Sequence, residues 1–238
     1  MNVNIIKHLD WDTSFFGYKV AQVIFDQSGS DYLKSIIRQL KIDGIHLTYF
    51  YVPQNDHSLN NDIEKCGGVL VDRKALFIKT PEHHSKFNNK VIEFSKREPD
   101  DRLLALALNA GRYSRFKLDK NFHNHEFEKL YTEWLLKSLD KTIASRVLVV
   151  NSVDSVVGLT TLMENDNNAC IGLVSVDDNY SGMGIATDLI HHVDNIAYEN
   201  KYATIKVVTQ QQNSRAFRLY ERCGFLVDDI TNIYHFWQ

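Results

Sequence analysis

The sequence is poor in cysteine and proline and has no long apolar run. Its 238 residues contain three cysteines, Cys66, Cys170 and Cys223, and this odd number at wide spacing matches neither a disulfide framework nor a set of zinc ligands. No apolar run approaches the roughly 18 residues that a membrane span requires, and residues 1–10 carry no hydrophobic segment of the signal-peptide kind. We therefore expect reduced thiols, no metal, no membrane partner and a cytoplasmic location.

A strong charge of one sign is also absent. The formal net charge is −3, so no global positive field draws the chain to nucleic acid, and we expect no nucleic-acid partner. The hydrophobic content of 44% is ordinary for a globular protein, and the length allows one large domain or two small ones.

Strand-like and helix-like segments alternate in the first third of the chain. Apolar residues at helical spacing predict a helix over residues 31–42. The polar stretch 81–89 (PEHHSKFNN) has no periodicity, and we place a domain boundary there. This boundary divides the chain into a smaller N-terminal α/β domain, residues 1–85, and a second domain, residues 90–238. The first domain is further expected to contain strands over 19–25, 46–52 and 76–79 and a helix over 59–66.

The second domain is expected to be a mixed α/β, mostly antiparallel sheet flanked by helices. Asp100 or Asp101 is expected to cap a helix that ends near Gly111, and a second amphipathic helix should cover 127–139. Strands separated only by turn-like residues predict antiparallel pairing. Strands are expected over 91–94, 147–151, 155–163, 169–176, 204–210 and 234–237, and further helices over 185–197 and 214–223.

The most informative local pattern is VSVDDNYSGMGIA, residues 174–186. A strand runs into a turn that contains Gly182 and Gly184, and an amphipathic helix begins at once. Glycine lets the backbone turn tightly and approach a ligand closely, and the first amides of a helix, which have no intrahelical partner, attract anions. A pyrophosphate would fit here, although the glycines could equally shape only a tight connection. The pattern is neither a P-loop nor a complete dinucleotide fingerprint.

A second pattern, VTQQQNSRAFRLYERCGF, covers residues 208–225. Asn213 or Ser214 can cap a helix that Gly224 ends, and Tyr220 lies on the apolar face of this helix. Helical periodicity alone fits Tyr220 as a core residue as well as a functional one.

Together the two patterns resemble the GNAT superfamily of N-acetyltransferases. The second resembles the pattern V-x-x-x-N-x-x-A-x-x-L-Y-x-x-x-G-F and matches it from Asn213 to Phe225. The glycine turn resembles the acyl-CoA motif R/Q-x-x-G-x-G/A with Gly182, Gly184 and Ala186 in register. The patterns occur in the family's order, and the resemblance covers roughly residues 91–238. Ser181 stands where the family usually has Arg or Gln, which implies weaker rather than lost support for a phosphate.

The resemblance implies an acetyl-CoA-dependent N-acetyltransferase in which a neutral amine attacks the thioester directly. In the family, the tyrosine of the L-Y pair is the general acid toward the CoA thiolate, which is Tyr220 here. Asn213 would contact the CoA arm or order a water, or serve only as a helix cap. Related enzymes tend to form dimers, so a homodimer is also implied. The implied cofactor-binding residues are Val174 and Val176, whose backbone faces the pantetheine arm where the strand splays from its neighbour, and Ser181, Gly182, Met183, Gly184, Ile185, Ala186 and Asn213.

A narrower resemblance points to the substrate. Residues 11–17 (WDTSFFG) and 114–139 look like the TDP-fucosamine acetyltransferase group, which acetylates the 4-amino group of a TDP-linked 4-amino-4,6-dideoxy sugar for polysaccharide biosynthesis. A nucleotide diphosphate needs cations. Candidates are Arg112, Arg115, Lys117 and Lys120, with a solvated loop face as the alternative, and Trp11, Phe15 and Phe16 could stack on the nucleotide or form a packed cluster at a strand entry.

The general base is left open. His123, His125 and Glu126 lie in a polar stretch before a helix, but histidines in loops are more often solvent-exposed, and a water relay would also serve. The sequence determines neither the sugar nor its configuration at C4. Two other functions stay open, a GNAT acetyltransferase of peptides or small amines and a non-catalytic acyl-CoA-binding protein.

The first domain contains a short echo of the second. EKCG at residues 64–67 parallels ERCG at residues 221–224, and each segment follows a predicted strand and helix. Ile63 stands where Tyr220 would be, and no glycine-rich turn precedes the first copy. We interpret the first domain as a degenerate GNAT-like half, with chance similarity as the rival explanation.

Overall fold

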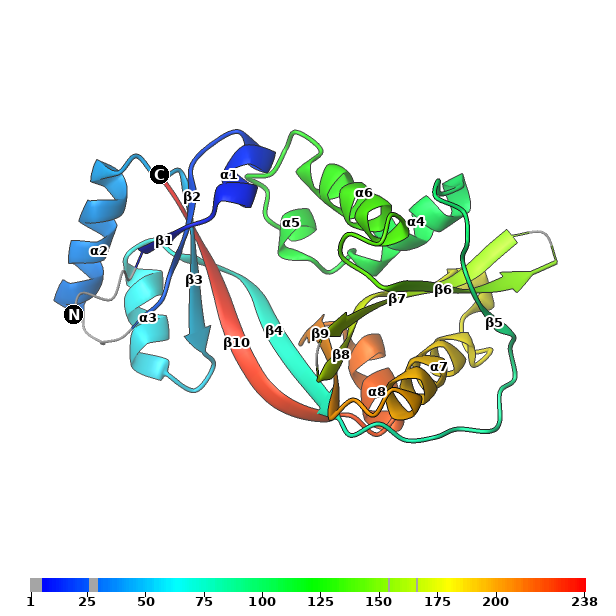
Figure 1. The fold of residues 1–238 in the computed structure, drawn as a ribbon. Helices are drawn as coiled ribbons and strands as arrows, with labels where there is room; N and C mark the ends of the chain where they lie inside the picture. Colours follow the sequence, from blue (N-terminus) through cyan, green and yellow to red (C-terminus); the bar gives the residue numbers. More distant parts are fainter. Residues whose placement is uncertain (1–5, 26–29, 154, 166) are drawn as a thin grey trace. The chain divides into compact units, whose positions relative to one another are not determined.

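The computed structural model describes residues 6–25, 30–153, 155–165 and 167–238, which divide into two compact units (Figure 1). The first unit comprises the described parts of residues 1–75 together with 229–238, and the second comprises 76–228. Two long strands, β4 (Val69–Lys79) and β10 (Leu226–Trp237), contribute residues to both units. Two predicted turns include residues 154 and 166, which lie outside the described residues.

The first unit is built on a small mixed sheet with the strand order β1-β2-β3-β10-β4. Strand β1 (Ile6–His8) runs antiparallel to β2 (Val20–Val23), which runs parallel to β3 (Leu47–Pro53). Strand β3 then pairs antiparallel with β10, with Tyr51 opposite Ile233. Strand β3 is therefore an interior strand only because the last residues of the sequence cover one of its edges.

Two helices supply the apolar core of the first unit. The predicted helices are confirmed as α2 (Ser30–Ile42) and α3 (His57–Lys65), the latter capped by the Asp56 carboxylate, which accepts from the Leu59 amide at 3.0 Å. Their apolar faces pack against the strands. The buried cluster includes Leu33, Ile36 and Leu40 of α2, Leu59 and Ile63 of α3, and Phe50, Val52 and Tyr234 of the sheet.

The second unit holds a larger, mostly antiparallel sheet with the order β4-β9-β8-β7-β6-β5. The predicted antiparallel run is confirmed, because β6 pairs with β7 and β7 with β8 in antiparallel register. Strand β9 joins β8 in parallel. The bounds are β5 Val91–Glu93, β6 Arg146–Ser152, β7 Ser155–Asn165, β8 Asn168–Val176 and β9 Thr204–Gln210.

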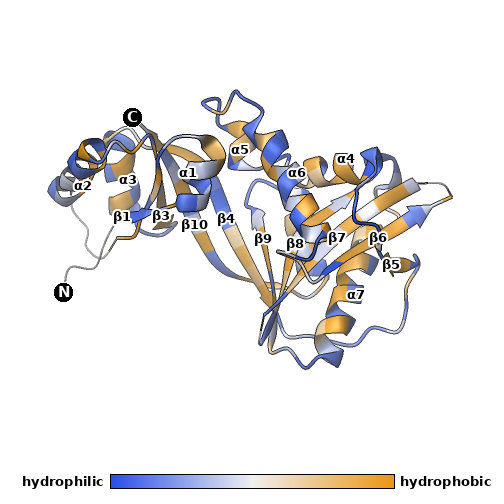
Figure 2. Cartoon of the chain, turned by 45° about the horizontal axis from the view of Figure 1, so that its top comes forward, coloured by the Kyte–Doolittle hydropathy of each residue, from blue (hydrophilic) through white to orange (hydrophobic). Residues whose placement is uncertain are grey.

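Helices cover both faces of this larger sheet. A Cβ added at Gly172 would approach Trp134 on one face, and one added at Gly158 would meet Ile185 and Leu189 on the other. Accordingly α4 (Asp101–Ala110), α5 (Arg115–Leu118) and α6 (Glu126–Leu139) lie on one side, and α7 (Ile185–Glu199) and α8 (Ser214–Arg222) lie on the other (Figure 1). Figure 2 shows apolar residues along β6, β7 and α7, where this core is formed.

Two strands are longer than predicted, and one helix was not predicted. Helix α1 (Asp10–Phe16) begins with two acidic residues in its first turn and ends at Gly17, shortly before β2. Strand β4 covers eleven residues rather than 76–79, and β10 covers twelve rather than 234–237. Both strands carry charged residues in their first halves, so the apolar signal marked only part of each.

Three consecutive elements of the first unit recur at a constant spacing in the second. Strand β3, helix α3 and strand β4 begin at residues 47, 57 and 69, and β9, α8 and β10 begin at 204, 214 and 226. The caps correspond as well, because Asp56 and Asn213 each accept from the amide three residues later. Both helices end at a cysteine followed by a glycine of positive φ, 97° at Gly67 and 83° at Gly224.

No helix among the described residues is both long and apolar enough to cross a membrane. The three cysteines are free thiols.

Candidate active site

A gap between two neighbouring strands forms the centre of the candidate site. Strands β8 and β9 pair in parallel from Asn168 opposite Thr204 to Ile171 opposite Val207, and there the ladder ends. Both strands are fully described and continue, β8 to Val176 and β9 to Gln210. The backbone of β8 beyond residue 171 therefore has donors and acceptors that β9 does not use, while β7 pairs with its other edge.

A β-bulge explains why the two strands separate there. On β8, Gly172 and Leu173 together oppose the single residue Thr161 of β7. The Leu173 amide donates to the Thr161 hydroxyl at 2.8 Å instead of to a backbone carbonyl. A Cβ at Gly172 would lie 2.6 Å from that hydroxyl, so this position requires glycine. The bulge turns β8 at the residue where its pairing with β9 stops.

The glycine turn follows β8 directly. A short 3-10 helix, η1 (Asp178–Tyr180), leads into Ser181, and both Gly182 (φ 82°) and Gly184 (φ 78°) adopt left-handed backbone conformations. Gly184 is the N-cap of α7 and has no side chain to cap it, so the first amides of α7 lack an intrahelical partner. An exposed glycine turn in front of a fifteen-residue helix is a suitable site for a phosphate group.

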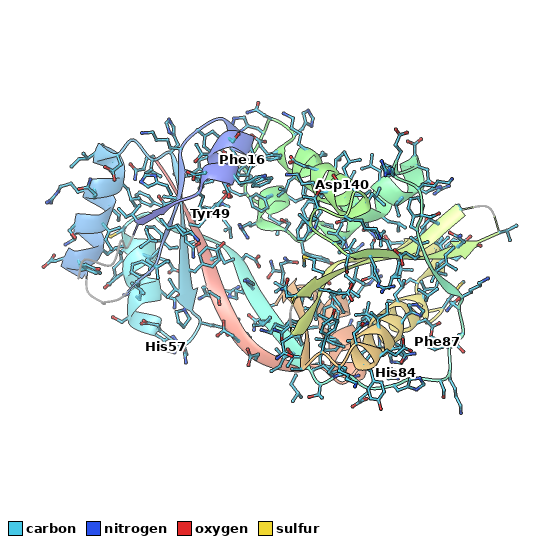
Figure 3. The ribbon with its side chains drawn as sticks, in the orientation of Figure 1. Phe16, Tyr49, His57, His84, Phe87 and Asp140 are labelled. Carbon is cyan, nitrogen blue, oxygen red and sulfur yellow. The ribbon has the colours of Figure 1, made fainter. Side chains whose placement is uncertain are left out.

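An extended segment, residues 80–90, braces the turn from outside, and we call it the strap. The backbone amides of Asn88 and Asn89 donate to the buried Asp188 carboxylate, at 3.2 and 2.8 Å, and the Asn89 side chain donates to the Met183 carbonyl at 3.1 Å. Figure 3 shows His84 and Phe87 of the strap beside α7, where His84 stacks on His191 at 3.8 Å. The strap therefore satisfies the Asp188 carboxylate with three hydrogen bonds.

Helix α8 carries Asn213 at its N-terminus and Tyr220 near its end. The Asn213 side chain caps the helix by accepting from the Ala216 amide at 3.2 Å, and its NH₂ group lies 3.4 Å from the Thr209 hydroxyl. At the other end of the helix, Cys223 forms a hydrogen bond with Thr187 in the first turn of α7. Burial raises the pKa of Cys223 to about 11, so this thiol stays protonated.

Tyr220 is buried, with 4% of its surface exposed. Its ring packs against Phe77 at 5.5 Å and Phe225 at 5.9 Å between centroids. Burial raises the pKa of Tyr220 well above the usual value near 10. The phenol is therefore fully protonated at neutral pH and can act as a hydrogen-bond or proton donor, but not as a base.

The other sequence candidates make local contacts of their own. His125 is an exposed residue with left-handed backbone at the start of α6, and Glu126 is buried with its carboxylate on the Asn124 amide at 2.7 Å. Of the four predicted cations, Lys117 pairs with Glu128 at 3.1 Å, and Arg115 lies over the Phe116 ring at 4.4 Å. Trp11 and Phe15 stack on each other at 4.9 Å within α1. Among the described residues, no group of three or more His, Cys, Asp or Glu side chains is arranged to hold a metal ion.

Two features of the site were missed from the sequence. Gly172 is an isolated glycine within a strand, a known signal for a bulge, and could have been found that way. The strap offered no signal, because its contacts join residues about one hundred positions apart.

Replacing Gly182 by Ala is expected to weaken acetyl-CoA binding about tenfold. The left-handed conformation costs a non-glycine residue about 1–2 kcal/mol, so the turn relaxes away from the geometry that presents its amides. Isothermal titration with acetyl-CoA measures the change. Gly44→Ala is the matched control, because Gly44 also has a positive φ, 67°, with no neighbour closer than 4.0 Å to an added Cβ, but lies in the first unit. Equal losses in both variants, or none in Gly182→Ala, would contradict a role of the turn in binding.

Comparison with known sequences points to the family that the sequence patterns resemble. The family model described as "Acetyltransferase (GNAT) family" matches residues 110–225. Over 234 residues, 95% of this chain and 81% of the relative, the sequence is 26% identical to the spore coat polysaccharide biosynthesis protein SpsD of Bacillus subtilis.

Two solved structures have the same fold. A GCN5-related N-acetyltransferase from Sphaerobacter thermophilus aligns with a TM-score of 0.58 at 15% identity, over 92% of this chain and 72% of that one. A conserved protein of unknown function from Staphylococcus epidermidis aligns with a TM-score of 0.68 at 14% identity, over 99% and 92%. The predicted mixed α/β, mostly antiparallel sheet flanked by helices is therefore confirmed.

Proposed function

We propose that this chain, whose residues 110–225 match the acetyltransferase (GNAT) family, is an acetyl-CoA-dependent acyltransferase that acetylates the 4-amino group of a TDP-linked 4-amino-4,6-dideoxy sugar. The observation that carries the donor half of this proposal is the gap between β8 and β9. The β8 backbone at Val174 and Val176, with which β9 does not pair, leads into the glycine turn at residues 181–186. A pantetheine arm would pair with this β8 backbone, and a pyrophosphate would bind at the glycine turn.

The chemistry requires a donor near the departing sulfur. The neutral amine nitrogen attacks the thioester carbon, the C–S bond breaks, the amine loses one proton, and the thiolate gains one. We assign the donation to Tyr220, whose buried hydroxyl is protonated throughout the neutral range. Burial also makes this phenol a weaker acid, so its contribution is greatest when negative charge has already developed on sulfur. The amine's proton passes to solvent, from which Tyr220 regains the proton that it donated, and no base is assigned.

The acceptor half of the proposal rests on relatives and on sequence. SpsD is named for spore coat polysaccharide biosynthesis, and that match extends over both units of this chain. The motif at residues 11–17, which resembles the TDP-fucosamine acetyltransferase group, folds as helix α1 with an aromatic cluster of Trp11, Phe15 and Phe16. A cytoplasmic location and a homodimer remain predictions.

The test is turnover with purified protein, acetyl-CoA and a panel of amines, followed by release of free thiol. We expect release with TDP-4-amino-4,6-dideoxyhexoses and none with peptides or polyamines. Release with peptides or polyamines alone would support an acetyltransferase function but contradict a sugar substrate. Acetyl-CoA binding without turnover on any amine would favour a non-catalytic acyl-CoA-binding protein.

We also propose that the first unit is a degenerate copy of the acetyltransferase half. The constant spacing of β3, α3 and β4 relative to β9, α8 and β10 supports this proposal. At the position of Tyr220 the first copy has Ile63, which is buried in the apolar cluster of its unit. The first unit therefore lacks the donor and would serve structure or substrate binding.

A further inference from the structure

A surface hollow of about 500 Å³ lies beside the candidate acyl-CoA site and is lined by Arg112, Tyr113, Asp178 and Arg215. These residues come from three segments of the second unit. Arg112 and Tyr113 connect α4 to α5, Asp178 follows the end of β8, and Arg215 lies in the first turn of α8. The hollow therefore faces the ends of the two strands that separate, and neither guanidinium belongs to the residues expected to hold acetyl-CoA.

The charges in the hollow are only loosely paired. Asp178 is the shared anion, with one carboxylate oxygen 3.1 Å from Arg215 and the other 3.5 Å from Arg112. The side chains of Arg215 and Asp178 are 62% and 65% exposed, and exposed ion pairs of this kind contribute about 0–1 kcal/mol. Two arginines and one aspartate leave a net positive charge. A ligand that carries more negative charge than a carboxylate can therefore displace Asp178 from the two guanidinium groups.

Neutral groups hold Arg112 in place. Its guanidinium donates to the Asn109 side chain at 3.1 Å, and Asn109 in turn donates to the Ser175 hydroxyl of β8 at 3.1 Å. The guanidinium also lies over the Tyr113 ring, 5.3 Å from its centroid. Arg112 is thus oriented independently of Asp178, which leaves its remaining donors available to a ligand.

We propose that Arg112 and Arg215 form a binding site for a phosphate group, with Asp178 as the internal anion that the phosphate displaces. Guanidinium groups bind phosphate oxygens with paired hydrogen bonds, and a phosphate carries more charge than a carboxylate. This inference rests on the proposed function, since both proposed substrates carry phosphates. One source is the 3′-phosphate or pyrophosphate of CoA, and the other is the diphosphate of the nucleotide acceptor.

The test uses calorimetric titration of the full chain with CoA, 3′-dephospho-CoA and dTDP. We expect Arg112→Gln and Arg215→Gln each to raise the Kd about tenfold for the ligand whose phosphate occupies the hollow. Asp178→Asn should act in the opposite direction and lower that Kd severalfold, because the competing anion is removed. Arg97→Gln removes the same charge from an exposed loop outside the hollow and should change no Kd.

The pattern among the ligands identifies the phosphate. A loss for CoA but not for 3′-dephospho-CoA assigns the 3′-phosphate, an equal loss for both assigns the pyrophosphate, and a loss for dTDP assigns the acceptor. The proposal fails if both arginine variants keep all three Kd values within twofold, or if Asp178→Asn weakens binding as they do, which would indicate a structural triad. None of these titrations needs turnover, so a wrong choice of acceptor sugar would leave the CoA results valid.

Discussion

Replacing Tyr220 by Phe is expected to lower kcat for acetyl transfer by at least a hundredfold while the Kd for acetyl-CoA changes less than about twofold. The substitution removes one oxygen atom and keeps the ring, which is packed between Phe77 and Phe225. General acids contribute about 10²–10⁴ to rate, and a donor to the departing thiolate acts in the transition state rather than in the bound ground state. The measurements are kcat from thiol release and Kd from calorimetry.

Tyr198→Phe provides the matched control for this result. Tyr198 lies on α7 with 53% of its surface exposed, so losing its hydroxyl should leave both kcat and Kd unchanged. A Tyr220→Phe variant with nearly normal kcat would reduce Tyr220 to a core residue. A parallel loss of kcat, acetyl-CoA affinity and thermal stability would point to misfolding rather than chemistry.

Replacing Asp194 by Asn is expected to produce the largest loss of stability among single polar substitutions in the second unit. The Asp194 side chain is fully buried and accepts from Lys79 Nζ at 2.5 Å, His84 Nε2 at 2.7 Å and the Glu82 amide at 2.7 Å. Lys79 is also buried, with 4% of its side chain exposed. Breaking a buried pair from one side leaves an uncompensated charge and costs about 3–5 kcal/mol.

This loss should appear in calorimetry as a fall in Tm on the order of 10 °C. Glu128→Gln breaks an exposed pair with Lys117 in the same unit, and its effect should stay within about 1 kcal/mol. The strap should also loosen from α7 in Asp194→Asn, which increased amide hydrogen exchange at residues 82–84 would report. A variant that melts within a degree or two of the parent would show that the Glu82 carboxylate, 3.5 Å from Lys79 Nζ, is enough to compensate the charge of Lys79.

The helices and strands around the candidate site were predictable because the residues that define them lie close together in the sequence. The cap at Asp100, the end of α4 at Gly111 and the bounds of β9 follow from residue types within a few positions of one another. The glycine turn and the α8 motif were located for the same reason. Their resemblance to a known family then led to the roles proposed above, which periodicity alone left undecided, as at Tyr220.

The remaining features depend on contacts between distant residues. No sequence pattern near Asp188 or Asp194 predicts that the strap will satisfy both carboxylates. The strap lies about one hundred residues earlier in the chain. Arg215 was visible within the motif, but its proximity to Arg112 arises only when α8 and the connection after α4 meet Asp178. The length of β10 was missed because its first half is exposed and pairs by backbone rather than by an apolar face.

The assignment of residues 229–238 to the first unit reverses the usual order of folding during synthesis. Domains ordinarily fold from the N-terminus as they leave the ribosome. Here the second unit, 76–228, is continuous and can be completed first, whereas β3 has no partner on one edge until residues 231–237 have been made. An unpaired, apolar β3 is an aggregation hazard while it waits. The nascent chain therefore has to carry β3 without this partner while residues 76–228 are being made.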